Sequence, residues 1–172
     1  MTAPEPTFTP INHIAYTAPL NPAGASPILT LPQVWAALQH KVNRAETFVP
    51  GAIRHTDILS HTTDQHGRAV TVREVTFREG NRRVRETCVF YPYMKVEFRQ
   101  PDGSLVMNIV SEGPRGAEEG DLQMTYTFEW LHPEMSQGEL AERKGKERAM
   151  AKMAVDSTIR VIRDMVRDGR IK

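Results

Sequence analysis

Two carboxylates in apolar strand-like segments are the first candidates for chemistry. Glu74 and Glu86 each stand among β-forming apolar residues. If the strand faces that carry them line a cavity, burial disfavours the ionised form and raises the pKa of each carboxyl. Such a group can act as a general acid, or as a base once ionised. The alternative is an exposed cross-strand ion pair with a nearby arginine: Arg73, Arg83 or Arg85.

Three further polar side chains fit a ligand site. Tyr126 and Trp130 combine ring surface with one polar group each, and Tyr126 is the expected catalytic partner of the glutamates. Both rings could equally pack as core against a helix, and a cavity wall allows both roles. Asn108 could donate a hydrogen bond to a ligand carbonyl, or could satisfy a bulge or strand end.

The remaining reactive residues predict neither a metal nor a cofactor. The six histidines show no HxH, HxxxH or HExxH spacing, so we interpret them as scattered surface or loop residues. The single cysteine, Cys88, has no basic neighbour on its own strand face and is predicted to be a buried, inert thiol. No glycine-rich loop joins a strand to a helix as a phosphate site requires.

Alternating strands must position these side chains. Between residues 122 and 130, every second residue is large and apolar and the others are polar, which predicts a sheet with one covered face. Residues 94–99 alternate in the same way. A first strand is predicted at 11–19, and turns at 64–67, 79–81 and 101–104 divide the region 53–131 into about six antiparallel strands.

Two helices complete the prediction. Thr30, Gln33 and Pro32 form a helix start, and Pro50-Gly51 ends that segment. A proline-free stretch from about 138 to 168 predicts a long terminal helix with a wide apolar stripe, followed by Gly169 as its C-terminal glycine. Its charged first part, 139–148, is expected to project into solvent. His40, Lys41, Asn43 and Arg44 are expected mostly on the polar face of the first helix.

The predicted fold is α+β, with a curved antiparallel sheet of about seven strands around the long C-terminal helix and a short helical segment after strand 1. Such an arrangement often leaves an apolar cavity between sheet and helix. The methionines could give it a plastic lining. The residues expected to contact a ligand are Trp35, Met94, Val96, Phe98, Asn108, Met124, Tyr126, Phe128, Trp130, Met150 and Met153.

Composition limits the classes of partner. A net charge near +1 gives no electrostatic case for nucleic acid binding, and no segment is long and apolar enough to span a membrane. One cysteine excludes an internal disulfide. We expect a single domain over residues 1–172, with 1–10 as a flexible lead-in, no secretory signal, a cytoplasmic location, and a monomer or homodimer.

Several strings in order resemble the START-like superfamily, also called Bet v 1-like or SRPBCC, and within it the AtaL-like branch (DUF1857). They are NHIAYTAPLN (12–21), LTLPQVWAALQHKVNRAETFVP (29–50), VREVTF (72–77), KVEFRQPDGSLVMNIVSEGP (95–114) and DLQMTYTFEWLHP (121–133). The resemblance implies the helix-grip fold and a hydrophobic cavity. Relatives carry lipids, sterols or plant metabolites, or cyclise polyketides and other natural products. Fungal AtaL-like genes often sit in secondary-metabolite clusters. No catalytic motif transfers residue by residue.

Three functions therefore stand side by side. The preferred hypothesis is a pocket protein that binds a hydrophobic or aromatic small molecule, in secondary metabolism. The first alternative is an enzyme on the same fold, a cyclase or related catalyst for a polyketide-like intermediate, using Glu74 or Glu86 with Tyr126. The second is a packed structural or interaction domain, which the volume of the interior would distinguish from the other two.

Overall fold

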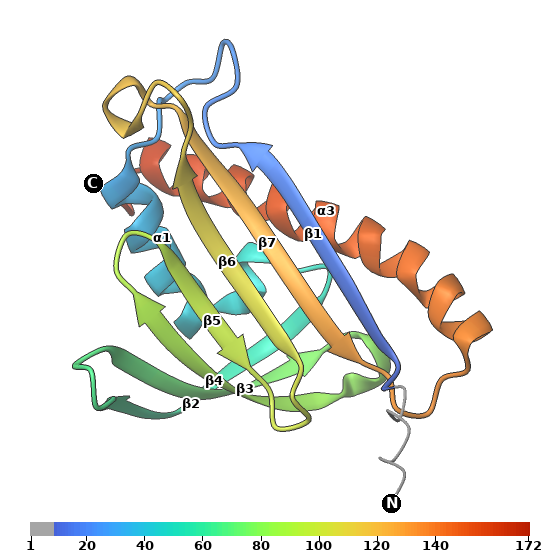
Figure 1. The fold of residues 1–172 in the computed structure, drawn as a ribbon. Helices are drawn as coiled ribbons and strands as arrows, with labels where there is room; N and C mark the ends of the chain where they lie inside the picture. The colour runs from blue at the N-terminus through green and yellow to red at the C-terminus, as the bar shows by residue number, and fades with distance from the viewer. Residues whose placement is uncertain (1–8) are drawn as a thin grey trace, which may run out of the picture.

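The computed structural model describes residues 9–172, and its main feature is one curved antiparallel sheet wrapped around a long helix (Figure 1). Its seven strands are β1 (Ile11–Pro19), β2 (Ile53–Thr63), β3 (Ala69–Phe77), β4 (Arg83–Tyr91), β5 (Lys95–Arg99), β6 (Leu105–Glu112) and β7 (Leu122–Leu131). Their order across the sheet is β1-β7-β6-β5-β4-β3-β2. Six strands follow one another as a meander, and the first strand closes beside the last. The predicted helix-grip arrangement is confirmed.

Helices pack against the sheet, and the two longer ones begin where the sequence predicts. They are α1 (Leu31–Asn43), α2 (Ala45–Phe48) and α3 (Gln137–Arg167), with two 3-10 turns, η1 (Glu79–Asn81) and η2 (Ala117–Glu119). Thr30 caps α1 in a capping box with Gln33, and Ser136 caps α3 in the same way with Glu139. Gly169 follows α3 with φ of +78°, a conformation that glycine adopts without strain.

The apolar row of β7 faces the interior, as its alternation predicts. Leu122, Met124, Tyr126 and Phe128 are each no more than 6% exposed, whereas the residues between them are only half-buried. The helix α3 runs along the concave side of the sheet (Figure 1). Its buried residues belong to the same core as the inward residues of β7. Burial of apolar surface between sheet and helix is the main stabilisation of this arrangement.

Two details differ from the expectation. The first helical segment breaks at Arg44, whose φ of −145° and ψ of 60° are not helical, so α1 and α2 are separate. The charged start of α3 is not uniformly solvated, because Leu140 and Glu147 are buried there. Tertiary contacts accompany both differences. Arg73 of β3 donates to the Lys41 and Val42 carbonyls at the end of α1, and Asn12 donates to the Glu147 carboxylate.

The N-terminal segment is attached to the chain after β7. Residues 1–8 of the expected lead-in lie outside the described residues, while the Pro10 carbonyl accepts a hydrogen bond from the His132 N–H at 2.8 Å. Among the helices described in residues 9–172, none has the length and apolar character needed to cross a bilayer.

Candidate functional site

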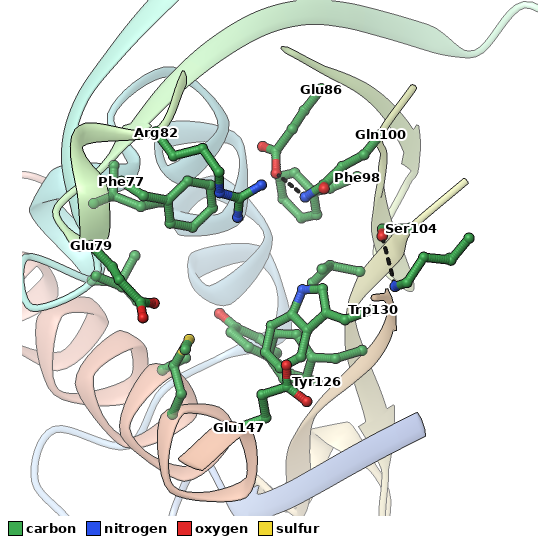
Figure 2. A pocket seen from close by; sticks show the side chains of 18 of the residues that line it. Phe77, Glu79, Arg82, Glu86, Phe98, Gln100, Ser104, Tyr126, Trp130 and Glu147 are labelled. Atoms are coloured by element: carbon green, nitrogen blue, oxygen red, sulfur yellow. Dashed lines mark hydrogen bonds between the residues drawn. The ribbon is translucent and has the colours of Figure 1, made fainter. Parts of the chain in front are cut away.

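A cavity of about 650 Å³ lies between the concave sheet face and the helices (Figure 2). Its wall contains a run of aromatic rings, one buried polar centre, one buried ion pair and a charged mouth. The side chains that line it include Lys41, Arg73, Phe77, Glu79, Arg82, Glu86, Phe98, Gln100, Val106, Asn108, Tyr126, Phe128, Trp130, His132, Arg143, Glu147 and Met150. This volume lies within the usual range of ligand pockets, ~300–1,000 Å³.

The aromatic wall is built mainly by β7. Tyr126, Phe128 and Trp130 occupy alternate positions of that strand, so all three rings face inward. The Phe128 and Trp130 ring centroids are 4.5 Å apart, and those of Tyr126 and Phe128 are 6.3 Å apart. Phe98 of β5 and Phe77 of β3 add rings from other strands. The wall therefore offers an extended aromatic surface to a flat ligand.

A lysine forms the centre of the buried polar group, which we call the lysine centre: Lys41, Asn108, Tyr126 and Thr158. The Lys41 Nζ donates to Asn108 Oδ1 at 2.8 Å and to the Tyr126 hydroxyl at 2.7 Å. The Tyr126 hydroxyl donates to Thr158 Oγ1 at 2.9 Å. Asn108 and Tyr126 stand directly opposite each other on β6 and β7, so strand register brings them together.

Burial controls the ionisation of this centre. Lys41 is 6% exposed, and removal from water lowers the pKa of its ammonium well below the usual value of 10.5. The positive charge of Arg73 lowers this pKa further, and the negative charge of Glu86 opposes the shift. Burial raises the pKa of Tyr126, only partly offset by its bond to Thr158, so the phenol keeps its proton.

Beside the lysine centre lies a second buried cluster, the arginine pair of Arg73 and Glu86. These residues face each other across β3 and β4, and Arg73 Nε and Nη2 donate to Glu86 Oε2 at 2.9 and 2.7 Å. Arg73 Nη1 also donates to the carbonyls of Lys41 and Val42 at 3.0 and 2.8 Å. These carbonyls belong to the last turn of α1 and have no partner within the helix, so Arg73 caps the C-terminal end of α1. Gln100 donates to Glu86 Oε1 at 3.3 Å.

At the cavity mouth, four charged or titratable side chains form what we call the mouth cluster: Glu79, His132, Arg143 and Glu147. Glu147 is 1% exposed and accepts bonds from Asn12 at 2.7 Å and from Arg143 at 3.3 Å, with His132 Nε2 at 2.7 Å. Arg143 also donates to both oxygens of Glu79 at 3.1 and 3.3 Å, and these bonds lower the pKa of that carboxyl.

A further cation, Arg82, lies at the cavity mouth. The Arg82 guanidinium lies over the Phe77 ring at 4.9 Å and faces the cavity (Figure 2). Within residues 9–172 it forms no side-chain ion pair or hydrogen bond. In Figure 2, Arg82 lies along Phe77 on one side of the cavity, while Trp130 and Glu147 lie across the cavity from it.

The structure brings together part of the expected site. Of the expected residues, those that line the cavity are Glu86, Phe98, Asn108, Tyr126, Phe128, Trp130 and Met150. Glu86 does not have the unpaired state that a catalytic acid needs, because Arg73 and Gln100 occupy its oxygens. Its place in the wall is therefore that of a charge partner.

Glu74 lies on the other face of the sheet. In β3, the inward positions are Arg73, Val75 and Phe77, so Glu74 points outward, where it pairs with Arg83. This is the exposed cross-strand ion pair that the sequence offered as the alternative. The side chain of Glu74 does not border the cavity.

Five expected ligand contacts also lie outside the cavity wall: Trp35, Met94, Val96, Met124 and Met153. Trp35 packs edge-on to Phe90, with centroids 6.3 Å apart, and Met94 is 47% exposed in the turn between β4 and β5. Val96 and Met124 are fully buried in packed core, and the Met153 side chain lies beside Gly51. Alternation gave the correct face for Val96 and Met124, but other side chains fill the space beneath them.

Cys88 agrees with its predicted inert state. It lies on the inward face of β4, fully buried, and burial raises the pKa of its thiol to about 12. The Arg73 charge opposes this shift and the Glu86 charge adds to it. Among residues 9–172, no three His, Cys, Asp or Glu side chains come together at positions suited to a metal ion.

Lys41, the central residue of the site, is not among the site residues expected from the sequence. Lys41 was expected on the polar face of α1, yet it lies seven residues after Val34 and three after Leu38, both buried. This spacing places it on the core side of the helix, and it is the signal that could have identified the lysine. Arg73 alternates with the inward Thr71 and Val75 in the same way. Glu147 carries the same signal, because it lies seven residues after Leu140 and four before Ala151, both buried, whereas His132 carries no comparable signal.

Solved structures share this fold at low sequence identity. The Zhui aromatase/cyclase from a Streptomyces species matches with a TM-score of 0.57 and 13% identity, covering 91% of this chain and 96% of that one. The di-domain ARO/CYC BexL from the BE-7585A biosynthetic pathway gives 0.55 and 13%; the match covers 90% of this chain, which spans about half (49%) of that one. Ara h 8.0201 gives 0.52 and 10%, covering 92% and 99%.

The sequence itself matches one family model. A search among curated proteins finds no match. The model of the AtaL family, described as acetylaranotin biosynthesis cluster protein L, matches residues 14–169. Among the described elements, this range contains most of β1, the strands β2 to β7 and the helices α1, α2 and α3. This span covers far more than half of the chain, and the chain therefore belongs to the AtaL family.

Proposed function

We propose that this protein binds a hydrophobic or aromatic small molecule that carries an oxygen function, in the cavity between sheet and α3. One observation supports this above all others: a cavity of about 650 Å³ with an aromatic wall ends on the hydrogen-bonding groups of Lys41, Asn108 and Tyr126. Apolar pockets with a few convergent polar groups are the usual form of ligand sites.

The family supports the metabolic setting of the proposal. AtaL is described as a protein of a biosynthesis cluster, and two of the fold relatives are named as aromatase/cyclases. A role in secondary metabolism is consistent with both. The same cavity argues against the packed structural domain, because a fully packed interior leaves no void of this size.

The two tryptophans provide a direct test. Trp130 lines the cavity and Trp35 packs outside it, and the chain has no other tryptophan. Titration with naphthalenemethanol, an aromatic alcohol without a carbonyl group, should quench the tryptophan fluorescence. The Trp35→Phe variant should keep this ligand-dependent quenching, because Trp130 remains. The matched Trp130→Phe variant should lose it.

The opposite pattern would contradict the proposal. Quenching that disappears in Trp35→Phe and persists in Trp130→Phe would place binding elsewhere. Native mass spectrometry of the purified protein adds a second measurement, because a ligand retained from the cell would appear as a discrete mass increment.

An enzyme on this fold is the second candidate, and a specific observation favours it. The lysine centre offers an amine with a lowered pKa, a phenol and an amide within one hydrogen-bonded group. Catalysis by Glu74 or Glu86, with Tyr126, has less support, since both glutamates are ion-paired. Glu86→Gln should test this role: unchanged turnover of a cyclisation substrate would exclude Glu86 as the catalyst.

A further inference from the structure

The hydrogen-bond partners of Lys41 match an uncharged amine. An ammonium group has three N–H donors, whereas a neutral amine has two N–H donors and a lone pair. Lys41 Nζ has two acceptors, Asn108 Oδ1 at 2.8 Å and the Tyr126 oxygen at 2.7 Å. The tyrosine oxygen is an acceptor here because its own proton is directed to Thr158. Both N–H groups of a neutral amine are thus satisfied, and no side chain in residues 9–172 donates a hydrogen bond to its lone pair.

The charges around the amine favour the same form. On β3, the Arg73 guanidinium is a like charge, and on β4 the Glu86 carboxylate is already bound by Arg73 and Gln100. β6, β7 and α3 contribute only neutral groups to the centre: Asn108, Tyr126 and Thr158. Among the residues that the structure describes, no carboxylate lies within ion-pair distance of Lys41 Nζ. The lowered pKa of Lys41 agrees with this geometry.

The amine is accessible to a ligand, although it is buried from solvent. Lys41, Asn108 and Tyr126 all border the cavity, and Phe98, Val106 and Phe128 surround them with apolar surface. A carbonyl carbon held against this wall can approach the lone pair of the nitrogen. The arrangement differs from the other five lysines, which are only partly buried or exposed. A desolvated lysine in an apolar pocket is an activated nucleophile.

We propose that Lys41 condenses with an aldehyde or ketone on an aromatic or apolar skeleton to form an imine in the cavity. This inference rests on the proposed function, because the carbonyl compound must first bind there. The Nζ lone pair forms a bond to the carbonyl carbon, and a proton passes from nitrogen to oxygen to give a carbinolamine. The C–O bond then breaks, and the oxygen leaves as water with the second N–H proton. One amine and one carbonyl yield one imine and one water.

Reductive trapping tests the imine. The intact protein is incubated with less than one equivalent of naphthaldehyde and sodium cyanoborohydride at neutral pH, digested and mapped by mass spectrometry. Cyanoborohydride delivers hydride to the imine carbon and leaves a stable secondary amine on the modified lysine. We expect most of the label on the Lys41 peptide. Lys41→Met should remove this label, whereas Lys152→Met, at an exposed lysine of α3, should retain it.

The matched alcohol separates this inference from the binding function. If naphthalenemethanol quenches Trp130 while the aldehyde labels only exposed lysines, the imine is wrong and the binding function stands. If neither molecule enters the cavity, the proposed function itself is wrong. The peptide map of the labelled wild-type protein gives the decisive result even if Lys41→Met fails to fold.

Discussion

Two buried basic side chains border the same cavity, and the charges of their surroundings differ. In the arginine pair, the Arg73 guanidinium forms an ion pair with the Glu86 carboxylate and donates hydrogen bonds to two helix carbonyls, so its positive charge is compensated. In the lysine centre, Lys41 has only neutral acceptors. A buried charge is tolerated only when it is paired, and otherwise the group becomes neutral. The comparison indicates that Arg73 supports the fold and that Lys41 is available for chemistry.

The largest expected effect is the loss of the carboxylate in the arginine pair. Glu86→Gln leaves the Arg73 guanidinium, which is 4% exposed, without a counter-charge. Breaking a buried pair from one side costs about 3–5 kcal/mol of unfolding free energy. Urea unfolding followed by circular dichroism measures this loss.

A matched substitution on the outer face supplies the control for that measurement. Glu74→Gln removes the partner of Arg83, whose side chain is 66% exposed. Water screens such a pair, so its loss should cost about 1 kcal/mol or less. Equal losses for the two variants would contradict the distinction between the buried and the exposed pair.

The next effect concerns the pH dependence of stability. The unfolded chain holds the Lys41 proton up to about pH 10.4, whereas the folded chain releases it at the lowered pKa. Between these two values the unfolded state binds more protons, so rising pH stabilises the folded state by up to about 1.4 kcal/mol per unit. Below the lowered pKa, the full cost of burying the ammonium remains. Lys41→Met lacks this dependence.

The free energy of unfolding of wild type should therefore rise relative to Lys41→Met as pH increases towards about 10. Urea titrations at several pH values between neutral and alkaline give the difference between the two proteins. A difference that stays constant over this range would mean that Lys41 has the same pKa in both states, and the contrast with Arg73 would fail.

Asn108→Asp converts the lysine centre into an ion pair that resembles the arginine pair. A carboxylate at this position, where Oδ1 now lies 2.8 Å from Lys41 Nζ, should raise the pKa of the lysine. Trapping of naphthaldehyde on Lys41 at neutral pH should fall about tenfold for each pKa unit regained. Asn43→Asp adds the same charge at an exposed position of α1 and should leave the trapping rate unchanged.

The smallest expected effect is at Cys88, which lies near both members of the arginine pair. Because its pKa is about 12 and it is fully buried, the thiol should react with dithiobis(nitrobenzoate) at pH 8 only as fast as the protein opens locally. The absorbance of the released thiolate measures the rate, and urea-unfolded protein supplies the reference. Rapid labelling of the folded protein would contradict the burial of this thiol beside the arginine pair.

Local sequence patterns determined most of the fold. The alternation of β7 from Leu122 to Trp130 fixed its inward face, because strand geometry turns every second side chain to the same side. The capping boxes at Thr30 and Ser136 are local hydrogen bonds within one turn of helix; the first was predicted from sequence and the second was not. These features need no information from distant residues.

The site depended on contacts between distant segments. Lys41 meets Asn108 and Tyr126 from 67 and 85 residues away, and Asn12 meets Glu147 from 135 residues away. Glu74 and Glu86 look equivalent in sequence, yet one pairs on the outside and the other inside. A strand pattern says which residues share a face, whereas only packing against another element decides which face is covered.

The sequence by itself determined a curved antiparallel sheet, a long terminal helix and an aromatic inner row. The spacing of apolar residues along a short segment is enough to distinguish a strand from a helix and to identify its buried face. The tertiary structure alone decided where the cavity remains open and which buried polar groups have partners. Solvation and pairing depend on groups that reach one another across the folded chain, so Arg73 is matched by a carboxylate and Lys41 is not.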